Sequence, residues 1–202
     1  MIKKASLSIL TVLIILGMIF WWQSGRVVTY GPGIMAPNEP VQLNLNAAEV
    51  FDFENYRLTP LADFEVHARV LSSKRYKRGR EADLSPVDLA LGWGRMSDET
   101  VIDQIHIRQL NRFYLWRVKQ FPIPQREIET HSANMHMVPA NDQIKRELKR
   151  VRKGDLVSFS GKLVRIDAPD GWRWTSSLTR TDTGNGACEL VYVKGFKITT
   201  PE

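Results

Sequence analysis

The sequence is poor in cysteine, with a single one, Cys188, among its 202 residues. One cysteine excludes a disulfide within the chain, and with it the class of small exported domains that disulfides hold together. The folded state must then depend on an apolar core. In its plainest interpretation Cys188 is itself a small residue of that core.

The sequence motifs of several familiar enzyme classes are also missing. There is no Gly-rich phosphate-binding loop, no HExxH zinc motif, no paired CxxC and no GxSxG. The four histidines are dispersed and no dense carboxylate cluster accompanies them, so we predict neither a metal site nor a cofactor. We find no internal repeat and no low-complexity segment.

Charge and hydrophobicity are both well represented. The chain is 43% hydrophobic and 25% charged, which is typical of a folded protein and excludes a disordered one. The formal net charge is +6. A basic surface favours anionic partners, either an anionic component of a cell envelope or an acidic protein.

One long apolar run, Ala5 to Trp22, contains no charged residue and no proline. Its eighteen residues span about 27 Å as a helix, close to the thickness of a bilayer core. Lys3 and Lys4 precede the run, so the positive-inside rule places the N-terminus in the cytoplasm. A cleaved signal peptide is the alternative, but residues 20–23 (FWWQ) lack the small residues of a cleavage site.

These features divide the chain into three parts. Residues 1–26 form a cytoplasmic tip and an uncleaved transmembrane anchor. Residues 27–40 contain three prolines and two glycines and predict an extended stalk. Residues 41–202 are expected to form a single domain on the side of the membrane opposite the cytoplasm, which in a bacterium is the periplasm. A nucleic acid does not fit that compartment as a partner.

The domain is predicted to be α+β and rich in strands. Alternating apolar residues predict a strand over 64–71, and aromatic residues predict a hairpin of 105–109 and 112–118. Further extended segments are predicted over 127–138, 155–167 and 187–198. Gly161, in the middle of one of them, predicts a bulge or a bend. The pattern from Glu127 to Ile198 resembles a small β-barrel of the OB type.

Three short helices are predicted from their capping residues. Ser85 followed by Pro86 is typical of a helix start and predicts a helix through Leu91. A second helix is predicted from Asp98 to Gln104. Asn141 is expected to cap a third helix, from Asp142 to Arg152, with one apolar stripe surrounded by basic residues.

Two basic segments and an aromatic pair are the candidate binding residues. Five basic residues occur within seven positions at the end of the strand over 64–71, and four more lie on the third helix. Two tryptophans share one face of an extended segment, which is typical of platforms that stack on sugars or bases. The set comprises Lys74, Arg75, Lys77, Arg78, Arg80, Lys145, Arg146, Lys149, Arg150, Trp172 and Trp174. We therefore expect a periplasmic binding or assembly module without catalysis.

A second hypothesis is a periplasmic cysteine-dependent hydrolase or transferase. Cys188 would be its nucleophile, His136 the base that raises the thiolate fraction, and Asn134 the group that orients the base. These are the residue types that such chemistry needs, although any chain with one cysteine and several histidines offers them.

Three stretches, residues 81–94, 132–140 and 182–189, resemble those of an uncharacterised family of single-anchor bacterial inner-membrane proteins. The resemblance implies the same location for this chain and carries no activity.

Overall fold

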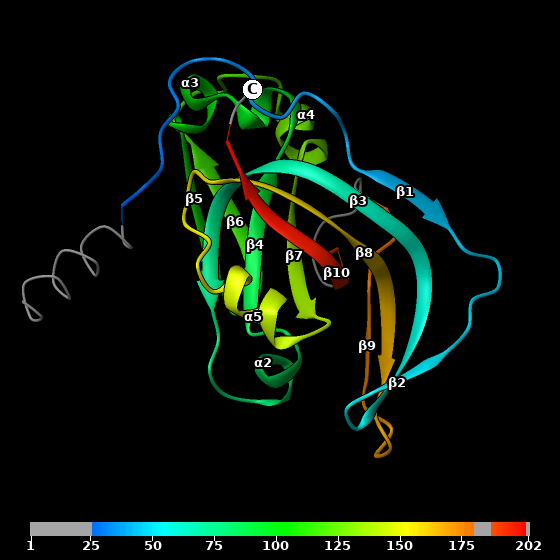
Figure 1. Cartoon of the computed structure of the whole chain (residues 1–202). Helices are drawn as coiled ribbons and strands as arrows, with labels where there is room; N and C mark the ends of the chain where they lie inside the picture. Colours follow the sequence, from blue (N-terminus) through cyan, green and yellow to red (C-terminus); the bar gives the residue numbers. More distant parts are fainter. Residues whose placement is uncertain (1–25, 180–186, 201–202) are drawn as a thin grey trace, which may run out of the picture.

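The computed structural model describes residues 26–179 and 187–200 and has a strand-rich α+β fold with few helices (Figure 1). The predicted transmembrane segment, Ala5 to Trp22, lies outside the described residues. Among the residues that are described, no helix has the length and apolar character needed to cross a membrane.

Five strands of the main sheet pair in a closed cycle. β3 (Tyr56–Arg75) pairs with β4 (Val87–Gly92), which pairs with β7 (Ser132–Pro139). β7 pairs with β10 (Glu189–Thr199), and β10 pairs with β8 (Leu156–Asp167). β8 returns to pair with β3. Every pairing in the cycle is antiparallel except β7 with β10, which is parallel. We call these five strands the ring.

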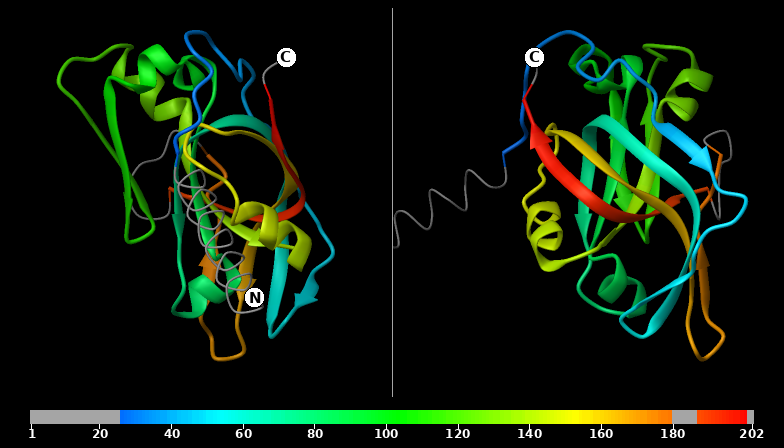
Figure 2. Two further views of the ribbon diagram at one scale, coloured as in Figure 1. Left: turned by 60° about the vertical axis from the view of Figure 1, so that its left-hand side comes forward. Right: turned by 45° about the vertical axis from the view of Figure 1, so that its right-hand side comes forward.

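Smaller elements surround the ring. β1 (Val41–Asn44) and β2 (Phe51–Phe53) pair with β3, and β9 (Arg173–Thr175) pairs with β8. β5 (Ile105–Leu110) and β6 (Phe113–Val118) form a separate hairpin, as predicted, which stands beside the ring in Figure 2. The helices are α2 (Arg80–Leu84), η1 (Gly94–Ser97), α3 (Glu99–Ile102), α4 (Gln125–Thr130) and α5 (Asp142–Leu148).

The interior of the ring is the main apolar core. Alternate residues of every ring strand point inward, among them Phe64 of β3, Leu89 of β4 and Met135 of β7. α5 lies beside β7 and β10 (Figure 1) and adds Ile144 and Leu148 to the same core. The Asn141 side chain accepts a hydrogen bond from Ile144 N at 3.0 Å, so the predicted cap of this helix is confirmed.

β8 comes very close to β10 at Gly161. A Cβ atom at this position would lie 2.1 Å from the carbonyl oxygen of Tyr192, so only glycine fits. The pairing register of β10 with β8 shifts nearby, between Val193 and Gly195. The irregularity expected at Gly161 is found in its partner strand, because the extra residue lies on β10, whereas β8 pairs with β3 in unbroken register through Gly161.

Two predicted elements differ in the structure. The helix predicted after Ser85 is instead strand β4, and the helix in this region is α2, which precedes Ser85. All six residues of β4 are buried, because it is paired on both sides and covered on both faces; this tertiary burial overrides the local capping signal. The first four residues of the segment predicted as extended over 127–138 instead belong to helix α4, Gln125–Thr130.

Part of the predicted stalk packs on the domain. Tyr30 N and Gly31 N both donate hydrogen bonds to Glu99 Oε2 at 3.0 Å, and Val28 N donates to Lys153 O at 2.9 Å. Arg69, which is 1% exposed, donates to Val28 O and to Glu99 Oε2. Residues 28–36 thus form a strap along the domain, visible as the blue segment in Figure 1.

Replacement of Glu99 is expected to loosen the strap. Burial alone would raise the pKa of Glu99, but the hydrogen bonds from Tyr30 N, Arg69 and Gly31 N outweigh it and lower the pKa below its ordinary 4.5. The ionised carboxylate therefore stabilises the fold above pH 4.5, and this contribution is lost as the pH falls through the lowered value. At neutral pH, Glu99→Gln should lower the free energy of unfolding by about 2 kcal/mol, because Arg69 loses its anion.

The measurement is unfolding of the full chain in neutral detergent, followed by circular dichroism between neutral and acid pH. Glu65→Gln, at an exposed position of β3, is the matched control and should change little. Equal stability of Glu99→Gln and the unsubstituted chain at neutral pH would contradict this account of the strap.

Candidate functional site

The outward face of β4 and β7 carries a row of polar side chains that are nevertheless buried. Asp88, Asn134 and His136 are at most 4% exposed, and Ser132 is 6% exposed. Their neighbours in sequence point into the ring, so the alternation of the two strands sets the polar residues on the opposite face. The predicted polar stripe of residues 132, 134 and 136 is thus in a buried hydrogen-bonded network.

The β5–β6 hairpin covers this face and brings a cation to it. Asn111 and Arg112 have φ angles of 50° and 66°, the backbone of a tight two-residue turn. Arg112 Nη1 donates to Asp88 Oδ1 at 2.7 Å, and Nη2 donates to Ser85 O at 3.1 Å. The carboxylate of Asp88 is fully buried, so this ion pair neutralises a charge that has no access to water.

Aromatic rings enclose the same guanidinium. The Arg112 Cζ atom lies 4.0 Å from the ring centroid of Tyr76 and 5.4 Å from that of Trp174. The Tyr76 hydroxyl accepts a hydrogen bond from Arg112 N at 3.1 Å. Burial, and secondarily the charge of Asp88, raises the pKa of Tyr76. Arg112 therefore joins the hairpin, the loop that contains Tyr76, and β9.

His136 completes the group around Asp88. Its Nδ1 atom lies 3.0 Å from Asp88 Oδ1, without the alignment of a hydrogen bond, and its ring centroid is 4.8 Å from that of Trp174. Within the described parts of the chain, Asp88 Oδ2 and His136 Nδ1 are buried atoms with no hydrogen-bond partner.

Cys188 and Asn134 are brought together, whereas the second hypothesis places His136 beside the thiol and has Asn134 orient His136. Asn134 Nδ2 lies 3.6 Å from Cys188 Sγ and donates to Arg112 O at 3.0 Å, while its Oδ1 accepts from Gln109 Nε2 at 2.6 Å. His136 shares the face, but the contacts that the structure gives its ring are with Asp88 and Trp174. Asn134 therefore orients toward the thiol and not toward the imidazole.

The first basic segment meets the aromatic pair. Arg80 donates to Asp170 Oδ1 at 3.1 Å, and its Cζ atom lies 5.1 Å from the centroid of the Trp172 ring. The hydrogen bond from Arg80 lowers the pKa of Asp170. Trp172 and Trp174 contact each other edge to face, with centroids 6.1 Å apart. Lys74, Arg75, Lys77 and Arg78 are exposed beside this group.

The second basic segment lies on α5 and the residues that follow it. Arg146, Lys149 and Arg150 are exposed, and Lys145 is half-buried. Lys145 and Asp83 of α2 line one cavity of about 340 Å³. The two basic segments are therefore on neighbouring elements, although they do not form a single cluster with Trp174.

Asp88, Arg112 and Tyr76 are site residues that the sequence analysis did not identify. One signal was present: Asp88 is a carboxylate inside an otherwise apolar run, and a buried carboxylate needs a partner. In the described residues no three His, Cys, Asp or Glu side chains are grouped closely enough to hold a metal ion.

Comparisons of this chain with protein-family models, with curated proteins and with solved structures gave no match.

Proposed function

We propose that this chain is a single-pass protein of the bacterial inner membrane whose periplasmic domain binds an anionic component of the envelope. The sequence from Ala5 to Trp22 supports the anchor, and Lys3 and Lys4 support a cytoplasmic N-terminus. The domain then acts as a binding or assembly module, without catalysis.

The pairing cycle supports an OB-type barrel, over a longer stretch than residues 127–198. Taken in chain order, the ring strands are β3, β4, β7, β8 and β10, and α5 lies between the third and the fourth. In OB folds, the second and third strands and the loops 1–2 and 4–5 bind oligonucleotides and oligosaccharides. Here the two loops correspond to residues 76–86 and the segment around β9, whereas the β5–β6 hairpin covers the outward face of the second and third strands, β4 and β7. This support is by analogy of fold.

The contact of Arg80 with Trp172 is the observation that carries the proposal. It joins the basic segment to the aromatic pair, and the partners Arg80 and Asp170 are 90 residues apart in the sequence. Cations beside half-buried aromatic rings suit a ligand with anionic groups and flat rings, such as an acidic glycan. The exposed Lys77 and Arg78 extend the basic surface on one side.

The cysteine-dependent enzyme is a second candidate because one specific observation favours it. Cys188 Sγ is 3.6 Å from Asn134 Nδ2, on the face that also holds the Asp88 and His136 pair. Such an enzyme would use Asp88 to orient His136, and Asn134 would contact the nucleophile directly.

Charge reversal tests the binding proposal. Lys77→Glu with Arg78→Glu should weaken binding of a heparin oligosaccharide to the full chain in neutral detergent by at least about tenfold at low salt. Lys149→Glu with Arg150→Glu should weaken it as well. The measurement is isothermal titration calorimetry, with uncharged dextran as the probe that should not bind.

The matched control is Arg108→Glu with Arg126→Glu, which reverses two exposed cations away from this surface. It should retain the affinity to within about threefold. An equal loss in the control, or unchanged binding in both test variants, would remove the proposal.

Thiol labelling separates the two candidate functions. The binding module should show Cys188 labelled more slowly in the native chain than in the denatured chain from about pH 5 to about pH 9, because the thiol packs half-buried beside Asn134. Fast native labelling with a midpoint well below about 8.5 would instead indicate an activated cysteine. The chain has no other thiol, so the labelling needs no background variant.

A further inference from the structure

A cavity of about 950 Å³ lies at the base of the β5–β6 hairpin, on another part of the domain from the surface proposed above. Its lining includes the buried Ile102 and Ile105, which give it an apolar floor. His106, Arg117, Lys119 and Lys153 line its open side.

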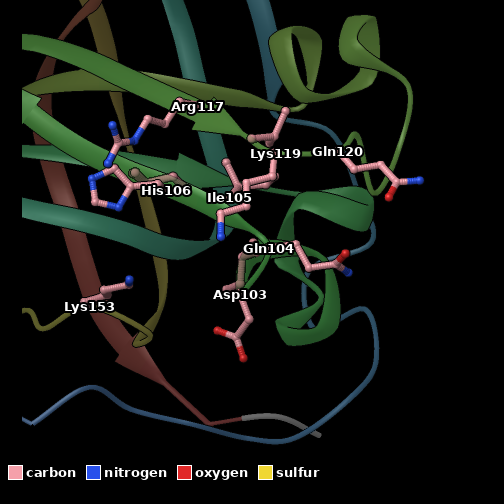
Figure 3. A pocket seen from close by; sticks show the side chains of 11 residues that line it. Asp103, Gln104, Ile105, His106, Arg117, Lys119, Gln120 and Lys153 are labelled. Atoms are coloured by element: carbon pink, nitrogen blue, oxygen red, sulfur yellow. The ribbon is translucent and has the colours of Figure 1, made fainter.

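The basic side chains of this cavity come from the β5–β6 hairpin and from the turn after α5. His106 and Arg117 are directly opposite each other in the hairpin register. Lys153 comes from the turn after α5, where Gly154 N donates to Val70 O at 2.7 Å and Lys153 O accepts from Val28 N at 2.9 Å. Figure 3 shows the nitrogen-bearing ends of these side chains and of Lys119 around one space, with the carboxylate of Asp103 turned away.

The cavity has an excess of positive charge over the residues that the structure describes. Its lining contains three permanent cations, Arg117, Lys119 and Lys153, and a single carboxylate, Asp103. Among the ion pairs of residues 26–179 and 187–200, none involves Arg117, Lys119 or Lys153. Cations that lie together in this way attract an anion with several acceptor oxygens, such as phosphate.

The position of the cavity in the chain points to the source of the anion. Val28, which is bonded to Lys153, follows Trp22 by only six residues, a span of at most about 20 Å. If the anchor ends at Trp22, the Lys153 backbone at one edge of the cavity lies within about that distance of the membrane surface. Basic residues that come within a Debye length of a bilayer, about 10 Å, attract the head groups of anionic lipids, and this short connection permits that approach.

We propose that this cavity binds the phosphate of an anionic membrane lipid, with Arg117, Lys119 and Lys153 as its cationic contacts. The choice of a lipid as the source rests on the membrane anchor of the proposed function, whereas the phosphate chemistry rests on the cavity alone. Lipid binding here sets the orientation of the domain on the membrane.

The test titrates the full chain in neutral maltoside detergent with dihexanoyl-phosphatidylglycerol, and separately with inorganic phosphate and with zwitterionic dihexanoyl-phosphatidylcholine. Calorimetry should show binding of the anionic lipid in preference to the other two. Arg117→Gln with Lys153→Gln should weaken that binding by about tenfold or more. Arg108→Gln with Arg126→Gln removes the same charge outside the cavity and should leave it unchanged.

Each other result would overturn the proposal. Inorganic phosphate binding as tightly as the lipid would overturn the lipid source, and equal losses in the two variant pairs would show attraction by net charge alone. Absence of lipid binding would overturn the site. Heparin binding should persist in Arg117→Gln with Lys153→Gln, so failure here is distinguishable from failure of the binding surface around Arg80 and Trp172.

Discussion

The buried carboxylate of Asp88 is the constraint on which the candidate site depends. It lies on a strand that is paired on both sides, with no access to water, and it needs a cation. Arg112 supplies that cation from the tip of the β5–β6 hairpin, which lies between β4 and β7 in the sequence and covers their outward face. The same guanidinium lies against Tyr76 and Trp174. One ion pair thus holds together the ring, the hairpin, the basic loop and β9.

A similar interaction attaches the N-terminal strap at another part of the domain. There the buried cation is Arg69, and the anion is Glu99, which also accepts hydrogen bonds from the strap backbone. In both places a buried charged side chain pairs with an opposite charge from a segment distant in sequence. Such pairs add little net stability compared with apolar packing, but losing one partner is costly, so each fixes the position of the segment that it holds.

Local signals in the sequence were sufficient for several elements. The turn at Asn111 separates β5 from the aromatic-rich β6, Asn141 caps α5, and Gly161 marks the close approach of β8 to β10. The turn and the cap depend on neighbouring residues. The prediction for β4 was wrong because Ser85 and Pro86 also suit a helix start. Only the pairing of these residues with β3 and β7 makes them a strand. The contacts of residues 28–36 could not be predicted either, because Pro and Gly content says nothing about distant partners.

The candidate site was predictable only in part, for the same reason. Asn134 and Cys188 were identified by their chemistry, and parallel pairing of β7 with β10 brings them together. The pair of Asp88 with Arg112 leaves no local pattern, because the hairpin fold determines where Arg112 lies. Arg80 and Trp172 were each identified within their own segment, but their contact required the three-dimensional arrangement.

A double-mutant cycle between Asp88 and Arg112 tests the central interaction most directly. Unfolding of the full chain in neutral detergent would be measured for Asp88→Asn, for Arg112→Gln and for the two together. We predict that the sum of the two single-variant losses in free energy of unfolding exceeds the loss in the double variant by about 2 kcal/mol or more. Each single change leaves a buried group without its partner. Losses that add within about 0.5 kcal/mol would contradict the account.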